Sequence, residues 1–203
     1  MSHNPLIVGR SALIVIDMQE GAYGADSGIP RMGGFAQRID QVRPLIERFR
    51  ALGHPVIFFA EQHRRSLIDF GRELDGEEGV HCLEGDPDTE IAKALDVGPE
   101  DFVIAKRRYS CFFATDLDLL LRSLRVDTVV LVGELTDVCI HYTFADAHQH
   151  DYFARVVEDC CGGSSAAAHL AALEAMSYLQ SAARTTAAGL MTALVASSGQ
   201  DPA

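Results

Sequence analysis

Residues 129–139 read VVLVGELTDVC, the segment whose pattern is most informative about the architecture. It begins with an uninterrupted apolar run, which is typical of a strand that is covered on both faces of a parallel sheet. A glycine follows, and then come Thr136 and Asp137, two residue types that commonly cap the N-terminus of a helix. The segment from Val138 to Gln149 contains neither Gly nor Pro. The stretch therefore predicts a buried strand that leads through a short turn into a helix, with Cys139 in the first helical turn.

The predicted position of Cys139 suits a nucleophile. Backbone N–H groups in a first helical turn have no helical partner and lie at the positive end of the helix dipole. That setting lowers the pKa of a thiol, and the same N–H groups can bind a developing oxyanion. The alternative is that Cys139 is a small buried hydrophobic residue, the usual role of a free cysteine. Whether Cys139 is a nucleophile or a core residue depends on which side chains from other segments lie beside it.

Composition limits the classes of function. The chain has 203 residues, of which 48% are hydrophobic, and this predicts a single domain over residues 1–203. Acidic residues (29) outnumber Lys and Arg (17), so binding to nucleic acid or to an anionic membrane is not expected. Apolar runs are only strand-length and the first residues do not form a secretion signal, which predicts a cytoplasmic protein. Five irregularly spaced cysteines argue against a disulfide framework and a structural zinc site.

Strand-like apolar runs alternate with helix-like amphipathic segments along the chain. The predicted strands are Ser11–Asp17, Pro55–Ala60, Asp101–Lys106, Thr128–Gly133, Phe153–Glu158 and Ala183–Thr186. The predicted helices are Phe35–Leu52, Thr89–Leu95, Thr115–Leu124, Val138–Gln149, Ser165–Ser181 and Ala187–Val195. This alternation predicts an α/β fold, a doubly wound and mostly parallel sheet of about six strands flanked by helices.

Three chemically capable residues follow or end predicted strands. Asp17 ends the first strand, Lys106 ends the third, and Cys139 follows the fourth. Ligands of such sheets bind beyond the carboxyl ends of the strands, where these residues would meet. Taken singly, Asp17 is explained as a loop cap and Lys106 as a solvated charge. Together, a carboxylate, an ammonium and a thiol at one edge indicate a catalytic site. The long polar segment Glu61–Asp88 is also predicted to be functional, because such loops are rare in compact domains.

Three motifs give the chain a resemblance to the isochorismatase-like cysteine hydrolases. They are ALIVIDMQ at 12–19, KRRYSCFF at 106–113 and GELTDVC at 133–139. The family includes nicotinamidase, N-carbamoylsarcosine amidase, ureidoacrylate amidohydrolase and biuret hydrolase. The resemblance implies a catalytic triad of Asp17, Lys106 and Cys139, and assembly as a homodimer or homotetramer. It also implies a cis peptide bond between Glu134 and Leu135, and an oxyanion hole made of the backbone N–H groups of Leu135 and Cys139.

The reaction implied by the resemblance is hydrolysis of a small carboxamide or ureide. Asp17 takes the proton of Cys139, the thiolate attacks the carbonyl carbon, and ammonia leaves from a thioester-like intermediate. Isochorismatase itself works without the cysteine, so the presence of Cys139 argues against that activity. Biuret, triuret, carbamoyl amino acids and nicotinamide all remain open as substrates. A non-catalytic binding module of the same fold is a further alternative.

A metal site is the feature that separates the subgroups. Nicotinamidase-like members bind a metal at Asp-x-His and a later His, whereas this chain has Glu61-Gln-His63-Arg64 and then His81. Glu61, His63 and His81 are therefore the candidate zinc or manganese ligands. The Glu-x-His-Arg form is more similar to biuret hydrolase and other ureide-cleaving members, which implies no metal and no other cofactor.

Other side chains are candidates for binding the substrate. Gln180 resembles the glutamine with which biuret hydrolase holds its substrate; an ordinary residue at a helix end is the alternative. Phe112 and Tyr142 are candidates for the pocket wall, although aromatic residues usually pack in the core. Arg64 and Arg107 are candidates for anchoring a carboxylate or a polarised carbonyl, and Glu61 completes the set.

Overall fold

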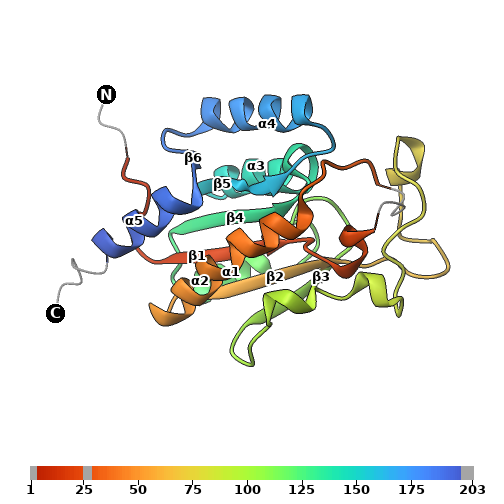
Figure 1. Ribbon diagram of the computed structural model, residues 1–203, viewed down its shortest axis with the longest axis horizontal. Coiled ribbons are helices and arrows are strands. Elements are labelled where there is room, and N and C mark those ends of the chain that lie inside the picture. Colours follow the sequence, from red (N-terminus) through yellow and green to blue (C-terminus); the bar gives the residue numbers. More distant parts are fainter. Residues whose placement is uncertain (1–3, 25–28, 198–203) are drawn as a thin grey trace.

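The protein is described by a computed structural model, which covers residues 4–24 and 29–197. A single sheet of six parallel strands crosses these residues in the order β3-β2-β1-β4-β5-β6 (Figure 1). The strands are β1 (Ser11–Ile16), β2 (Val56–Glu61), β3 (Phe102–Lys106), β4 (Thr128–Glu134), β5 (Phe153–Gly162) and β6 (Arg184–Thr185). The predicted doubly wound α/β fold is confirmed.

Helices cover both faces of the sheet. One face carries α1 (Phe35–Ala51) and α5 (Ala187–Ser197), which lie in front of the strands in Figure 1. The other face carries α2 (Leu117–Ser123), α3 (His141–Gln149) and α4 (Ala166–Leu179). β1, β2 and β4 are buried along their whole length, which explains why these strands read as continuous apolar runs. No helix in the described ranges is long and apolar enough to cross a membrane.

The strand order reverses between β1 and β4. From β1 the chain winds outward through β2 to β3, then returns to add β4 on the other side of β1. In doubly wound sheets this reversal opens a crevice beyond the carboxyl ends of the two strands. Ile16 and Gly133 are register partners there, and a Cβ at position 133 would lie 2.0 Å from the Ile16 carbonyl oxygen. Glycine at 133 therefore lets the two central strands approach each other at the crevice.

Some predicted element boundaries are wrong. Thr89–Leu95 is not an α-helix but contains parts of two short 3-10 turns, Pro87–Thr89 and Lys93–Leu95. Ile91 between them forms an antiparallel bridge with Gln19, which extends the backbone there. α2 begins only at Leu117; Asp116 before it provides no side-chain cap, and the Thr115 hydroxyl accepts from the Leu117 N–H at 3.3 Å. β5 continues four residues beyond the predicted Glu158, through an irregularity in its pairing with β4.

Candidate active site

Asp17, Lys106 and Cys139 meet at the crevice. Asp17 directly follows β1, Lys106 is the last residue of β3, and Cys139 lies in the turn after β4. The Lys106 Nζ atom is 2.8 Å from Asp17 Oδ2 and 3.4 Å from Cys139 Sγ. Ligand atoms of Asp17, Cys139 and Glu61 all lie within 4.8 Å of one another. The structure thus brings together the three residues on which the predicted chemistry depends.

The turn that carries Cys139 differs from the predicted helix start. Residues Thr136–Ile140 form a π-helical turn before α3, and the bond between Glu134 and Leu135 is cis, as expected. Thr136 and Asp137 are not caps. The Thr136 hydroxyl lies 2.8 Å from His169 Nδ1, and the Asp137 carboxylate accepts hydrogen bonds from the Ser164 backbone N–H and hydroxyl. Both side chains therefore fasten the turn to the beginning of α4.

Burial governs the protonation of the three residues. Burial raises the pKa of Asp17 to about 6, against the opposing charge of Lys106. Burial also raises the pKa of Cys139 well above its ordinary value, again with Lys106 opposing. The expectation of a thiol pKa lowered by the helix N-terminus is therefore wrong, because Cys139 is only 4% exposed. Burial alone would lower the pKa of Lys106, but neighbouring acidic groups, chiefly Asp17, outweigh burial and raise it well above its ordinary value. At neutral pH the site consists of a thiol, a carboxylate and an ammonium.

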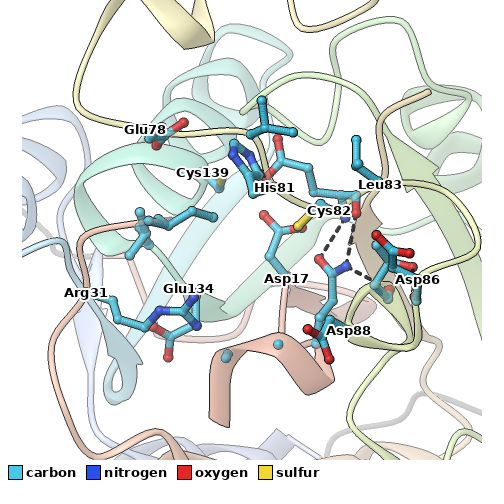
Figure 2. A pocket seen from close by; sticks show the side chains of 18 of the residues that line it. Asp17, Arg31, Glu78, His81, Cys82, Leu83, Asp86, Asp88, Glu134 and Cys139 are labelled. Atoms are coloured by element: carbon cyan, nitrogen blue, oxygen red, sulfur yellow. Dashed lines mark hydrogen bonds and ion pairs between the residues drawn. The ribbon is translucent and has the colours of Figure 1, made fainter. Parts of the chain in front are cut away.

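Cys139 and Asp17 line a cavity of about 350 Å³, a volume typical of a small-molecule site. Figure 2 shows Arg31 and Glu134 on one wall, Asp86 and Asp88 on another, and Asp17 between them. The wall is mainly acidic; its carboxylates are Asp17, Glu61, Glu78, Asp86, Asp88 and Glu134. Leu135 also lines the cavity, next to the cis bond. Of the predicted substrate-binding residues, Glu61 is part of this lining.

The two predicted anchoring arginines lie outside the cavity lining. Arg64 is exposed, and its Nη1 atom is 2.8 Å from Asp69 Oδ2. Arg107 donates to the Gln62 carbonyl oxygen and to Glu84, and its Nε atom is 3.6 Å from Asp69 Oδ2. Their prediction as substrate anchors is corrected, because acidic partners within the long loop already occupy both guanidinium groups.

Gln180 is also placed away from Cys139. It caps the C-terminus of α4, and its side-chain oxygen accepts from the Ala154 N–H at 3.1 Å, near the start of β5. Its amide nitrogen donates to the Tyr152 carbonyl at 2.9 Å. A helix that follows a parallel strand runs back along the sheet, so its last residues reach the amino ends of the strands. Gln180 is therefore a structural residue at the opposite end from the crevice.

The two predicted aromatic residues do not line the cavity either. Phe112 stacks on His150, at the C-terminal end of α3, and on Tyr152. Tyr142 is 54% exposed and stacks on Tyr109, with the ring centroids 5.8 Å apart. Tyr109 is itself a lining residue, so Tyr142 supports the wall from outside rather than forming it.

Glu61, His63 and His81 come together as the sequence predicts, and Glu73 joins them. All four side chains are buried, and one ligand atom from each lies within 4.8 Å of the others. The His63 Nε2 atom is 3.1 Å from Glu73 Oε2, and the His81 Nε2 atom is 3.8 Å from Glu61 Oε2. Neither Nε2 atom has a hydrogen-bond partner. Two imidazoles and two carboxylates fit a divalent cation such as zinc or manganese.

Sequence reasoning missed Glu73, Arg31 and Glu134. Glu73 lies in a short 3-10 turn of the long loop, and Arg31 lies in the Gly-rich loop after β1; neither position carries a periodic signal. Glu134 could have been found, since it ends a central strand in the way that singled out Lys106. Its Oε1 atom is 2.6 Å from Arg38 Nε. Burial raises the pKa of Glu134 to about 7.

Comparisons with known proteins find likeness over most of the chain. The family model described as the isochorismatase domain matches residues 11–188. The ureidoacrylate amidohydrolase RutB of Pantoea ananatis is 33% identical over 171 residues, 74% of this chain and 68% of that protein. RutB of Yersinia enterocolitica is 33% identical over 73% of this chain and 74% of that protein.

Two solved structures illustrate the likeness of the fold. An isochorismatase-like hydrolase from Alkaliphilus metalliredigens has a TM-score of 0.81 at 26% identity, over 91% of this chain and 99% of that one. The pyrazinamidase of Pyrococcus horikoshii, solved in complex with zinc, has a TM-score of 0.77 at 27% identity, over 88% of this chain and 99% of that one.

Proposed function

Because the chain belongs to the isochorismatase family of hydrolases, we propose that it is a cysteine-dependent amidohydrolase. It cleaves a C–N bond of a small ureide or carboxamide and releases ammonia. The observation that carries this proposal is the position of Lys106, whose Nζ atom contacts both Asp17 and Cys139 at a small cavity. A buried ammonium between a carboxylate and a thiol stabilises both anions that the reaction needs.

The reaction begins with a proton transfer. The thiol of Cys139 is neutral at pH 7, so its Sγ atom becomes nucleophilic only as Asp17 removes the proton. The carbonyl carbon of the substrate then bonds to Sγ, and its oxygen becomes an oxyanion. The backbone N–H groups of Leu135 and Cys139 stabilise that oxyanion. Lys106 keeps its proton throughout and stabilises the thiolate as it forms.

The second half returns the enzyme to its starting state. Asp17 donates its proton to the amide nitrogen as the C–N bond breaks, and ammonia leaves. The acyl or carbamoyl group remains bonded to Sγ. Asp17, ionised again, takes a proton from water, and the hydroxide oxygen attacks the same carbonyl carbon. The C–S bond breaks, the thiolate regains the proton from Asp17, and the acid product departs. One water is consumed for each ammonia released.

The test is ammonia release from a panel of biuret, carbamoyl amino acids, ureidoacrylate analogues and nicotinamide. Cys139→Ser is expected to lower kcat by at least about 10³-fold, because the reaction loses its nucleophile. Cys160→Ala is the matched control, since Cys160 is equally buried but packs among the core residues beneath α1 and α5. Unchanged turnover by Cys139→Ser would falsify the proposal. Silence of the wild-type protein across the whole panel would favour a non-catalytic binding module.

A metal-dependent nicotinamidase is the second candidate, favoured by the cluster of Glu61, His63, Glu73 and His81. These four side chains would hold a divalent cation, which supplies a Lewis acid at the cavity wall that Glu61 and His81 line. In this case the purified protein contains about one metal ion per chain, Glu73→Gln lowers that content, and chelation abolishes nicotinamide turnover. Ureide turnover that survives chelation supports the metal-free reaction instead. Elemental analysis of the wild-type protein and of Glu73→Gln distinguishes the metal-dependent nicotinamidase from the metal-free amidohydrolase.

A further inference from the structure

The guanidinium of Arg31 lies in an acidic cavity, where the charge of Glu134 acts on it without a direct contact. Arg31 lines the same cavity as Asp17 and Cys139, and it is half-buried. Within residues 4–24 and 29–197 it makes no hydrogen bond and no ion pair within 4.0 Å. Glu134, whose charge acts on Arg31, is already paired with Arg38 through its Oε1 atom. A partly buried guanidinium that makes no hydrogen bond is costly, so a ligand that supplies an anion would be favoured here.

The other basic side chains at the site already have acidic partners. Lys106 contacts Asp17, Cys139 and Glu61, and His81 lies against Glu61. Arg31 is therefore the cationic lining side chain that remains available among the described residues. Besides Asp17, and Glu134, which pairs with Arg38, four further carboxylates line the cavity, so an anionic group on a ligand is repelled there. The charge pattern defines both where a carboxylate can bind and where it cannot.

The backbone beside Arg31 is fixed to the scaffold. The Met32 N–H donates to the Gly163 carbonyl oxygen at 2.8 Å, which ties the segment to the end of β5. Arg38 of α1 donates to the Gly33 carbonyl oxygen at 2.8 Å. A guanidinium carried on an anchored backbone loses little entropy when it binds a planar carboxylate through two N–H groups.

We propose that Arg31 binds the carboxylate of the substrate, and that the substrate class is therefore ureido carboxylic acids rather than neutral ureides. This inference rests on the proposed function, since it places the ureide carbonyl at Cys139 and the carboxylate at Arg31. In Figure 2 the Arg31 wall lies to one side of Asp17, away from Asp86 and Asp88. A ligand bound in this way spans the cavity from Arg31 to the reacting thiol.

The experiment measures binding without turnover, in a Cys139→Ala protein, by titration calorimetry. The probes are three acids, each paired with the alkylurea in which a methyl group replaces the carboxylate. The pairs are ureidoacetate with ethylurea, 3-ureidopropionate with propylurea, and 4-ureidobutyrate with butylurea. We expect at least one acid to bind about 10-fold or more tightly than its partner, because a charged hydrogen bond replaces an apolar contact.

Arg31→Gln is then introduced into the same protein. It is expected to weaken binding of the preferred acid by about 10- to 100-fold and to leave its alkylurea within about twofold. Arg72→Gln is the matched control, because Arg72 is an exposed arginine of the long loop that pairs with Asp75 and does not line the cavity. Circular dichroism confirms that each variant is folded.

The proposal is overturned if no acid binds more tightly than its alkylurea, or if Arg31→Gln weakens both members of a pair equally. Failure of the proposed reaction is seen separately. If an acid binds in an Arg31-dependent way but the wild-type protein does not hydrolyse it, the proposed reaction is wrong and the proposed carboxylate site is supported. If the protein hydrolyses neutral ureides at a rate that Arg31→Gln does not change, the proposed reaction is supported and the proposed carboxylate site is wrong.

Discussion

Replacing Lys106 by methionine should move the acid limb of the pH–rate profile upward. In the proposed reaction Asp17 must be ionised to accept the proton of Cys139, and burial raises the pKa of Asp17 to about 6. The value of kcat/KM in the wild-type protein should therefore be half-maximal near pH 6. At pH 5 about one tenth of the carboxylate is ionised, so the rate should fall to about one tenth of its plateau.

The variant removes the cation that opposes the rise in pKa. Lys106 Nζ is 2.8 Å from Asp17 Oδ2, and both its charge and its hydrogen bond lower the pKa of that carboxyl. Burial, which raises the pKa, remains. An opposite charge at this distance typically lowers a carboxyl pKa by about 1–3 units. The acid limb of Lys106→Met should therefore lie about 1–3 pH units higher. Activity at pH 7 should fall because a smaller fraction of Asp17 is ionised, apart from any other effect of the substitution.

The assay is the initial rate of ammonia release at low substrate concentration, from pH 4.5 to 9, at constant ionic strength. Lys93→Met is the control, because Lys93 is an exposed lysine of a 3-10 turn outside the cavity lining. Lys106→Gln provides a second, more polar replacement if the methionine variant does not fold. An acid limb that stays in place, or moves downward, when Lys106 is removed would refute the coupling of Asp17 to Lys106.

Further predictions concern stability. Gly133→Ala should lower the free energy of unfolding by about 3 kcal/mol or more in denaturant titration, because residue 133 has φ near 125° and its Cβ would collide with the Ile16 carbonyl. Gly53→Ala, at a positive φ with open space around it, should cost only about 1–2 kcal/mol. Gln180→Ala should cost about 1–3 kcal/mol in the same titration while KM stays unchanged; a large rise in KM with unchanged stability would restore Gln180 to the substrate site.

The parts of the site that lie at strand ends could be predicted from the sequence. An apolar run gives the direction and the end of a buried strand, and parallel strands end at one edge. Asp17 and Cys139 follow from that rule, and Lys106 follows although β3 lies two strands away from β1. The long lysine side chain reaches across to the crevice, so its position at the edge of the sheet did not matter.

The wrong assignments concern residues whose surroundings are set by non-periodic segments. Arg64 and Arg107 are occupied by Asp69 and Glu84, and no pattern in the sequence indicates how the loop folds back to form those pairs. Gln180 was assigned by resemblance alone. The direction of α4, which runs back from the crevice, would have placed Gln180 at the far end. Arg31 was missed for the same reason as the arginine pairs, since only the loop geometry brings it to the cavity.

The residues proposed for chemistry and those proposed for selectivity occupy different kinds of backbone. Asp17 and Lys106 lie at the carboxyl ends of strands and Cys139 lies in the turn after β4, whereas Arg31, Glu78 and Asp88 lie on the loops around them. Substitutions in those connections change which molecules fit without disturbing the strands that set the spacing of the reacting atoms. During evolution such a scaffold can exchange one nitrogenous substrate for another by small steps, each of which leaves a working hydrolase. Directed evolution of new substrate preferences should therefore begin at residues 29–31 and 78–88 rather than in the sheet.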